Sequence, residues 1–488
     1  MLFNSYIFIF LFLPIVWSVY FVFNKCRCYK LALVALIVSS FIFYGYQEPK
    51  LCFLLGGTIV ANYFFHRILI RMNGLKIQKW VLYIGILMNL SLIFYFKYFN
   101  FFLENVNRLV ENDFVLKNIM LPLGISFFTF QQISMLVDSS KPDMEKYSFI
   151  EYALFVSYFP QLIAGPIVLH QELIPQFREE AKKRVHYENI MSGVEYFVFG
   201  FAKKVLVADS FARICDAGYA NIATLNAYST ILTILAFTLQ IYFDFSGYCD
   251  MALGLGKLFN FELPINFNSP YKAESIADFW KRWHMTLTRF LTTYLYIPLG
   301  GNRKGLLRTC LNIMIVFGIS GLWHGAAWTF ILWGLLHGVM QVIYRLGKKH
   351  FDKLPKWFMW TMTFLFINIA WVFFRAEFFR QPFQLMKRLL VGGGGLCQEA
   401  LLSVSSDNSV AVALLSNLFP SILLETVRQG SIALWFLIWI AVCVLAPSSH
   451  EIVEMKIRRN RYFIILGLLF AWTLTWLPQI SKFIYFNF

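Results

Sequence analysis

The stretch LNIMIVFGISGLWHGAAWTFILWGLLHGVMQVIY, residues 311 to 344, contains no aspartate, glutamate, lysine or arginine. Because about 20 residues of helix cross the hydrocarbon core of a bilayer, this run is long enough for two short membrane helices. Only helices satisfy their own backbone hydrogen bonds in lipid without closing a barrel. The stretch therefore predicts an all-α membrane protein.

The composition of the whole chain agrees with that prediction. Of its 488 residues, 58% are hydrophobic and 14% are charged, whereas charged residues make up about a quarter of a soluble domain. We expect a polytopic protein with roughly ten to thirteen spanning or re-entrant helices. The expected segments are 5–24, 29–47, 50–66, 79–100, 118–137, 149–168, 189–208, 228–247, 311–346, 358–374, 430–447 and 462–480.

The positions of the basic residues predict how the chain is oriented. No lysine or arginine precedes Lys25 and no small-residue cleavage site follows the first apolar run, so we expect that run to remain as a helix. Because cytoplasmic loops carry excess lysine and arginine, the N-terminus is predicted to lie outside. The basic residues after the first and third expected spans are Lys25, Arg27, Lys30, Arg67, Arg71, Lys76 and Lys79. Loops that face an anionic leaflet account for the net charge of +16, and the scatter of these residues argues against nucleic-acid binding.

Motifs of several common enzyme classes are absent from the sequence. There is no GxSxG elbow, Walker loop, HExxH or GxGxxG motif. The eight cysteines include no CxxC pair, and Cys26 and Cys28 are too close together for a zinc half-site, so no metal site is expected. An enzyme built from this chain is left with imidazole, which can take a proton from a hydroxyl and pass it on. Acyl transfer from a thioester to an alcohol fits that chemistry.

We expect one integral-membrane domain over 1–488, with a motif-bearing core at 118–377, a polar connection at 377–429 and C-terminal helices at 430–488. Two segments of the core, LPLGISFFTFQQ (121–132) and FPQLIAGPI (159–167), contain helix-breaking proline and glycine. Non-helical backbone at membrane depth persists only where protein buries it or where it lines a cavity. The two segments are therefore either kinked spans held by neighbours or walls of a cavity.

Two carboxylates interrupt the apolar segment QIYFDFSGYCDMALGLG, residues 240 to 256. Intramembrane carboxylates are costly and mark a pathway, a proton relay or a structural ion pair. For Asp244 we favour a role near a functional site over a purely structural pair; Asp250 shares the segment. Gly254 and its neighbouring glycines permit close helix packing.

An amphipathic helix is predicted over about 276–296. Ser275 with Asp278 fits an N-terminal cap, and Pro298 stops the helix. The apolar stripe consists of Ile276, Phe279, Trp280, Trp283, Leu287, Phe290, Leu291 and Tyr294, and the polar face of Asp278, Lys281, Arg282, Thr288, Arg289 and Thr292. His284 lies at the border between the two faces, either solvated at the membrane interface or on the wall of a polar cavity.

His324 is the ionisable side chain at the centre of SGLWHGAAW, residues 320 to 328. It could be a buried core histidine, a metal ligand or a catalytic base, and these residues alone favour the first. Gly321 and Gly325 allow close helix approach, and with these glycines flanking it no bulky residue of its own chain is expected to shield His324, which suits access by a reactant. His337 falls on a different face if the helix is continuous, because thirteen residues correspond to about 220° of rotation.

Six segments in this order resemble the membrane-bound O-acyltransferase family, in the bacterial branch that acetylates alginate, peptidoglycan and cellulose. They are LPLGISFFTFQ, FPQLIAGPI, FDFSGYCDMALGLG, NFNSPYKAESIADFWKRWHMTLTRFLTTYLYIPLGGNR, SGLWHGAAWTFILWGLLHG and WVFFRAE (371–377). The resemblance implies a ring of helices around a central tunnel or funnel. It also implies that His324 is the catalytic histidine and His284 the second histidine of the family.

Other residues receive roles that follow from these two. We expect the tunnel to be lined or supported by Asp244, Asp250, Trp323, Asn268 and Trp280. Lys281, Arg282 and Arg289 would draw an anionic donor to its mouth, although contact with lipid headgroups explains them equally well. Cys249 stands where relatives commonly have serine, which argues against an essential nucleophile at this position.

The resemblance implies an acyl donor on the cytoplasmic side, acetyl-CoA, and no bound cofactor. It implies transfer towards an envelope or exported polysaccharide, directly or through a separate extracytoplasmic acetyltransferase, in a bacterial inner membrane. Three alternatives stay open: a D-alanyl transferase of the teichoic-acid branch, a non-enzymatic polysaccharide or lipid transporter, and a membrane scaffold that recruits an acetyltransferase.

Overall fold

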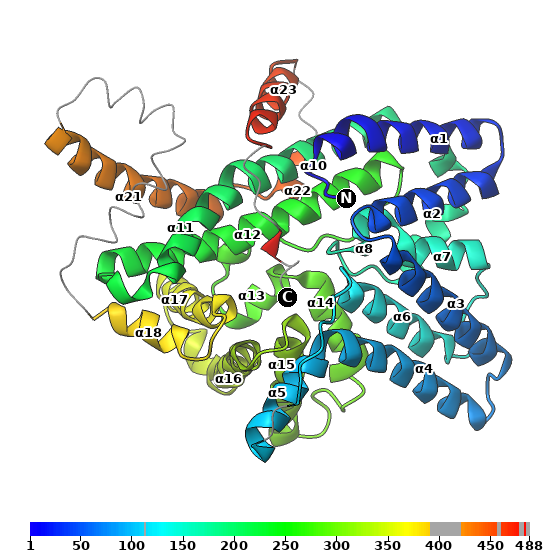
Figure 1. The fold of residues 1–488 in the computed structure, drawn as a ribbon, viewed down its shortest axis with the longest axis horizontal. Helices are drawn as coiled ribbons and strands as arrows, with labels where there is room; N and C mark the ends of the chain where they lie inside the picture. Colours follow the sequence, from blue (N-terminus) through cyan, green and yellow to red (C-terminus); the bar gives the residue numbers. More distant parts are fainter. Residues whose placement is uncertain (112–113, 391–420, 456–459, 478–482, 485–488) are drawn as a thin grey trace. The chain divides into compact units, whose positions relative to one another are not determined.

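The computed structural model describes residues 1–111, 114–390, 421–455, 460–477 and 483–484 (Figure 1). Within these ranges all regular secondary structure is helical, which confirms the predicted all-α class. Seven of the described helices are long and apolar enough to cross a membrane. Their bounds are Phe8–Lys25, Lys50–Arg71, Ile77–Val110, Ala227–Leu258, Leu306–His324, Trp328–Phe351 and Lys356–Arg375.

The chain divides into two compact units, which are described separately. The first contains 1–201, 248–266 and 286–299, and the second contains 202–247, 267–285 and 300–488. The predicted core at 118–377 contributes to both units, and its bounds stay a prediction. Of the predicted polar connection at 377–429, residues 391–420 lie outside the described residues, and α18 (Gln381–Arg388) occupies part of the remainder.

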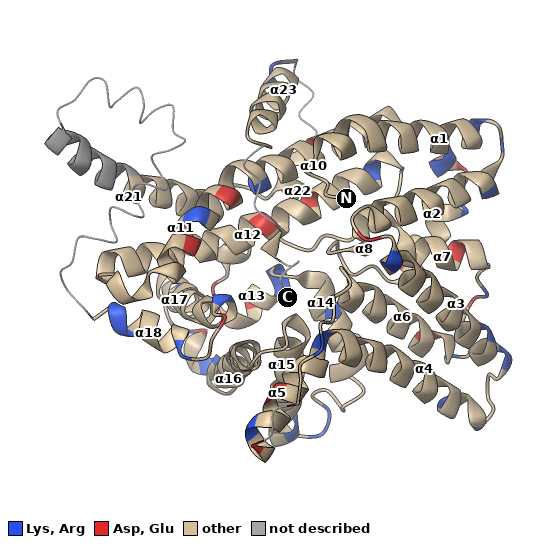
Figure 2. Ribbon diagram, in the orientation of Figure 1, with Lys and Arg blue, Asp and Glu red and all other residues tan. Residues whose placement is uncertain are grey.

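Four N-terminal helices form one side of the first unit. They are α1 (Leu13–Lys25, preceded by the π-helix η1, Phe8–Phe12), α2 (Tyr29–Gly45), α3 (Lys50–Arg71) and α4 (Ile77–Ile93). Helices α1 and α2 lie side by side, and α4 packs on α6 (Ile125–Ser139) (Figure 1). Figure 2 shows lysine and arginine at the turns that join α1 to α2 and α3 to α4, where the sequence places the cytoplasmic loops.

Helix α5 (Phe99–Val110) follows α4 through the π-helix η2 (Phe94–Tyr98) and runs in a different direction (Figure 1). Asn100 and Asn107 are seven residues apart, so they lie on one face about 10 Å apart. Each side chain exchanges two hydrogen bonds of 2.8–3.1 Å with the backbone of one residue, Lys117 and Phe114 respectively. Three extended residues also span about 10 Å, so the two asparagines hold 114–117 alongside the helix.

The proline- and glycine-rich segments of the core meet inside the first unit. Helix α6 begins at Ile125, later than predicted, because Gly124 has a φ of 73° that a helix interior does not allow. A side chain at Gly124 would lie 2.5 Å from the carbonyl oxygen of Leu162 and 2.9 Å from Cα of Ile163. The predicted span at 149–168 is broken into α7 (Phe149–Ser157), α8 (Phe159–Leu162) and buried irregular chain. Burial of non-helical backbone by protein is therefore confirmed here.

Short elements and one long helix complete the first unit. They are α9 (His170–Leu173), η3 (Pro175–Phe177), η4 (Ala181–Lys183), α10 (Tyr187–Ala202), the end of α12 (Ala227–Leu258), α14 (Met285–Leu291) from Thr286 onward and η8 (Thr292–Tyr296). A side chain at Gly254 of α12 would lie 2.5 Å from the carbonyl oxygen of Gly193 in α10. The close packing predicted for Gly254 is therefore confirmed.

The second unit contains the remaining helices. They are η5 (Lys203–Ala208), α11 (Asp209–Ala220), η6 (Ile222–Thr224), α12 up to Gly247, η7 (Pro270–Lys272), α13 (Ile276–Arg282), α15 (Leu306–His324), α16 (Trp328–Phe351), α17 (Lys356–Arg375), α18, α21 (Ser421–Leu445), α22 (Ser449–Glu454) and α23 (Asn460–Thr475). Helices α15 and α16 make the most extensive helix pair, and α17 packs on α16. The apolar run at 311–344 is thus divided between two helices, as its length allowed.

Candidate active site

His284 does not lie within a helix, so the prediction of one continuous helix over 276–296 is wrong. Helix α13 ends at Arg282, Trp283 is extended with φ −99° and ψ 128°, and His284 has a φ of 44°. The backbone N–H of Asn268 donates to the carbonyl oxygen of Arg282 at 2.9 Å, which satisfies an acceptor at the end of α13. This turn leaves the His284 side chain fully buried, so the prediction of a histidine at the border between two faces is also wrong.

The sidedness predicted for this segment is confirmed despite the break. Ser275 caps α13, since its hydroxyl oxygen accepts the backbone N–H of Asp278 at 3.1 Å. The predicted apolar stripe is buried from Ile276 to Leu291, whereas Lys281 is exposed. The apolar pattern therefore predicted burial correctly, although it did not predict the backbone.

His324 is the last residue of α15. Gly325 is extended, with φ −163° and ψ 152°, and α16 begins three residues later at Trp328. A side chain at Gly325 would overlap the ring of Phe330, so this ring occupies the space that the sequence argument left open beside His324. The expectation that His324 lacks a bulky neighbour is therefore wrong: it is 3% exposed and surrounded by rings.

Aromatic side chains from three elements surround His324. Its ring centroid lies 4.9 Å from that of Trp323, 5.0 Å from Trp333 on α16 and 5.3 Å from Phe374 on α17, all with steep interplanar angles. The predicted supporting role of Trp323 is consistent with this contact. Trp333 and Phe374 were missed, although the quoted motifs SGLWHGAAWTFILWGLLHG and WVFFRAE contain them.

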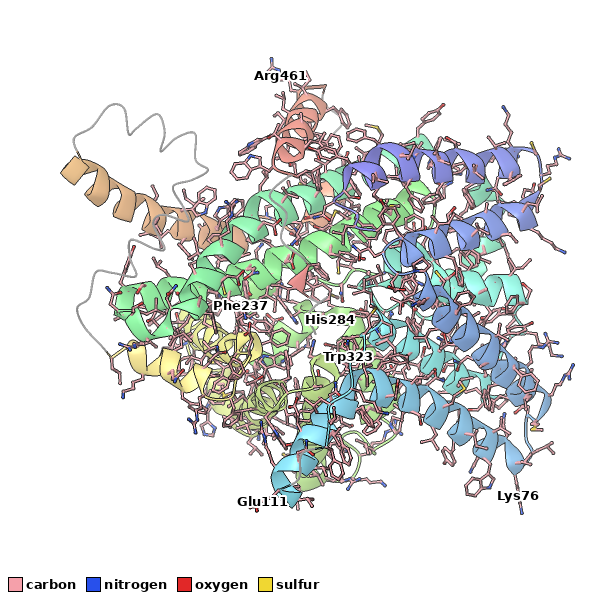
Figure 3. The ribbon with its side chains drawn as sticks, viewed as in Figure 1. Lys76, Glu111, Phe237, His284, Trp323 and Arg461 are labelled. Carbon is pink, nitrogen blue, oxygen red and sulfur yellow. The ribbon has the colours of Figure 1, made fainter. Side chains whose placement is uncertain are left out.

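The two predicted catalytic histidines meet within the second unit. Their ring centroids are 6.3 Å apart, at an interplanar angle of 61°. His284 also contacts Trp323 at 6.0 Å and the ring of Phe245 at 4.9 Å, edge to face. Figure 3 labels His284 and Trp323, which lie close together among densely packed side chains. The break at Trp283–His284 and the end of α15 thus bring together two imidazoles that are forty residues apart in sequence.

His337 belongs to the same aromatic cluster, so the prediction that it points elsewhere is wrong. That rotation assumed an uninterrupted helix, whereas 325–327 are not helical. The indole N–H of Trp280 donates to Nδ1 of His337 at 3.2 Å, and the His337 ring lies 4.9 Å from Trp333. This hydrogen bond places the proton of a neutral His337 on Nε2. Trp280, predicted as a supporting residue, reaches the cluster through it.

Asp244 lies in a buried ion-paired group, 1% exposed at its side chain. Its Oδ1 is 2.6 Å from Nζ of Lys204, and the same Nζ is 2.8 Å from Oδ1 of Asp209. Lys204 in η5 and Asp209 at the start of α11 were missed, because neither has a periodic relation to Asp244 in the sequence. Both side chains are about 4% exposed.

The other predicted residues lie in different places. Asp250 and Arg289 belong to the first unit, where Arg289 is bonded to Glu172 and to the carbonyl oxygen of Ile167. In the second unit, Arg282 pairs with Asp278 at 3.0 Å, and the exposed cation is Lys281. Asn268 contributes its backbone to the turn described above. Among the described residues, no group of three or more His, Cys, Asp or Glu side chains could hold a metal ion.

The fold and this arrangement define a class of protein: a multi-pass membrane protein with two buried, adjacent imidazoles between aromatic walls. The model of the MBOAT, or membrane-bound O-acyltransferase, family matches residues 77–379. This match covers more than half of the chain. The chain therefore belongs to the membrane-bound O-acyltransferase family and is an acyltransferase.

Curated relatives are similar over most or all of the chain. A peptidoglycan O-acetyltransferase of Helicobacter pylori is 40% identical, over 100% of this chain and 98% of its own. A protein of Pseudomonas aeruginosa named probable alginate O-acetylase AlgI is 39% identical, over 77% of this chain and 72% of its own. A teichoic acid D-alanyltransferase of Bacillus subtilis is 24% identical over 53% of this chain and 70% of its own. The O-acetylation relatives are thus the more similar ones.

Proposed function

We propose that this acyltransferase moves an acetyl group from a cytoplasmic thioester across the membrane for O-acetylation of an envelope or exported polysaccharide. The observation that carries the proposal is the 6.3 Å separation of His284 and His324, both buried between aromatic rings. The relatives support the acetyl group, since the full-length relative at 40% identity is named for O-acetylation of peptidoglycan. The weaker similarity to a D-alanyltransferase makes D-alanine the second candidate.

In the proposed step, His324 acts as general base. Its imidazole takes the proton of the acceptor hydroxyl while the hydroxyl oxygen attacks the thioester carbonyl carbon. The carbon–sulfur bond then breaks, and the proton passes to the leaving sulfur, so that an ester and a free thiol are formed. A neutral imidazole suits this role, because only its unprotonated nitrogen can accept the proton. A transient acyl group on His324 is the alternative course of the same transfer.

In this proposal His284 assists the same step from the side opposite His324. Its position at 6.3 Å lets it hold the acceptor or the thioester oxygen while His324 transfers the proton. Trp323 contacts both rings and fixes their relative orientation. We assign acetyl-CoA as the donor, with the exposed Lys281 as the cation best placed to attract its phosphates.

The proposal includes a location and a partner. The distribution of lysine and arginine supports a bacterial inner membrane protein with its N-terminus outside. The acetyl group then leaves on the side opposite the donor. We assign completion of the transfer to an extracytoplasmic acetyltransferase, with the polysaccharide as final acceptor.

The test is His324→Ala, with acetyl ester on isolated envelope polysaccharide as the readout. Loss of general base catalysis is expected to lower the rate by about 10²–10⁴-fold. His350→Ala is the matched control, because His350 is an exposed histidine on the adjacent helix α16 and its loss should leave ester levels unchanged. Wild-type ester levels in the His324→Ala strain, at equal membrane abundance, would contradict the assignment.

Two further measurements separate the alternatives. Purified protein with labelled acetyl-CoA should consume the thioester, whereas a transporter or a scaffold would not. Supplying D-alanyl thioester in place of acetyl-CoA should give little transfer, and preferential use of D-alanine would move the protein to the teichoic-acid branch.

A further inference from the structure

Two described residues near the C-terminus, Phe483 and Ile484, reach the interior of the second unit. The backbone N–H of Ile484 donates to Oδ2 of Asp244 at 2.8 Å, which joins two residues 240 positions apart. Phe483 and Ile484 are 4% and 8% exposed. Phe483 and Ile484 are thus packed against α12 at Asp244, the carboxylate that is paired to Lys204.

The group that receives this hydrogen bond is charged. Lys204 is paired with both Asp209 and Asp244, and all three side chains are at most 4% exposed. Buried carboxylates are costly unless their oxygens accept hydrogen bonds. Nζ of Lys204 forms an ion pair with Oδ1 of Asp244, and the backbone N–H of Ile484 donates a hydrogen bond to Oδ2. A hydrogen bond to a charged acceptor is stronger than one between neutral groups, so the buried carboxylate of Asp244 favours this docking.

The docked segment is one side chain away from the candidate catalytic pair. Phe245 directly follows Asp244, and its ring lies 6.1 Å from that of Phe483. The same Phe245 ring lies 4.9 Å from His284, edge to face. Phe483 therefore packs on a ring that itself contacts His284, whose backbone is held in the left-handed region.

We propose that the Lys204–Asp209–Asp244 group anchors Phe483 and Ile484, and that these two residues hold Phe245 against His284. Asp244 and Ile484 are then positioning residues for acyl transfer. The effect on the reaction rests on the proposed function, whereas the docking itself does not.

Substitution of Ile484 tests the hydrogen bond without altering the charged group. Ile484→Pro removes the N–H donor, and Ile484→Ala keeps it and serves as the matched control. Loss of one charge-assisted hydrogen bond at a positioning contact should lower kcat by about tenfold in the proline variant, with the donor KM unchanged. The alanine variant loses buried side-chain contacts but keeps the N–H, so its kcat should stay well above that of the proline variant. Equal kcat in the two variants would overturn the proposal, as would a change confined to KM.

A second measurement does not depend on activity. A photoreactive phenylalanine analogue placed at Phe483 in the full-length membrane-embedded protein should crosslink to the α12 peptide that contains Asp244 and Phe245. The same analogue at Trp472, which is 58% exposed on α23, is the control and should not crosslink to that peptide. Asp244→Leu should abolish the crosslink from position 483. A crosslink that survives this substitution, or never reaches α12, would overturn the anchoring.

The two measurements distinguish failure of this inference from failure of the proposed function. If the wild-type protein transfers no acetyl group but position 483 crosslinks to α12 in an Asp244-dependent way, the docking stands and the proposed reaction fails. If acetyl transfer requires His324 but position 483 does not crosslink, the reaction stands and the anchoring fails.

Discussion

His284 combines two costly properties in one residue. Its imidazole is fully buried, and its φ of 44° lies in the left-handed region, which costs a residue with a Cβ roughly 1–2 kcal/mol. Strain of this kind persists where the surrounding structure determines it, and it clusters at functional sites. The left-handed backbone at His284 directs its ring away from the helical direction and towards His324. The strained conformation therefore brings the two imidazoles together.

His284→Asn is expected to separate the chemistry of this residue from its backbone role. Asparagine tolerates the left-handed region and keeps a polar side chain, so the thermal unfolding midpoint should stay near that of wild type. Acetyl transfer should fall by about 10²-fold or more if the imidazole takes part in proton transfer.

His284→Ala is the comparison for that prediction. It should lose activity to the same extent but unfold at a lower temperature, because alanine retains the left-handed strain and leaves a cavity. Transfer rates near wild type in His284→Asn would reduce His284 to a structural residue.

At the scale of elements, apolar periodicity predicted correctly which side chains are buried, but it did not predict where helices are interrupted. The stripe from Ile276 to Leu291 is buried as predicted, because that pattern depends only on which side chains must leave water. No glycine or proline in the sequence around His284 indicates that the helix is interrupted there. It depends instead on contacts that are distant in sequence, such as the bond from Asn268 to the end of α13.

The candidate site shows the same division. Both histidines came from motifs. The contacts of Trp333 and Lys204 instead depend on which helices pack together, and periodicity within one segment does not contain that information. The rotation calculated for His337 failed for a related reason, since three residues of non-helical chain reset the phase between α15 and α16.

Two glycines of α15, Gly318 and Gly321, allow a test of how α15 and α16 pack against each other. A side chain at Gly321 would overlap the carbonyl oxygen of Phe330 and lie 3.2 Å from Cα of Gly334, so backbone would have to move. Overpacking of this kind costs about 1–3 kcal/mol, and here it also displaces His324, the next turn of the same helix. Gly321→Ala should therefore lower both the unfolding midpoint and acetyl transfer.

Gly318→Ala is the matched control on the same helix. Its added carbon would lie 3.6 Å from Cδ2 of Leu335, an ordinary contact, and alanine favours the helix by up to about 1 kcal/mol. Unchanged or raised stability is expected in a thermal melt of the detergent-solubilised protein. Equal losses in the two variants would show that the crossing is not set by Gly321.

At the scale of the molecule, the reaction requires that donor and acceptor sides be assigned. The first unit provides the markers, since basic residues gather at the α1–α2 and α3–α4 turns (Figure 2). Two native cysteines, Cys26 and Cys28, lie exposed at the first of these turns. Labelling of these two cysteines can therefore report on which side of the membrane this turn lies.

With an outside N-terminus, Cys26 and Cys28 face the cytoplasm, because Phe8–Lys25 crosses the membrane once before them. In a variant that keeps these two cysteines alone, a membrane-impermeant maleimide should label inverted vesicles and leave intact spheroplasts unlabelled. Gln47→Cys, exposed between α2 and α3, is the control that should label from the opposite side in a background lacking all native cysteines. Labelling of Cys26 and Cys28 in intact spheroplasts would reverse the orientation. The assignment of Lys281 to attract a cytoplasmic donor would then have to be revised as well.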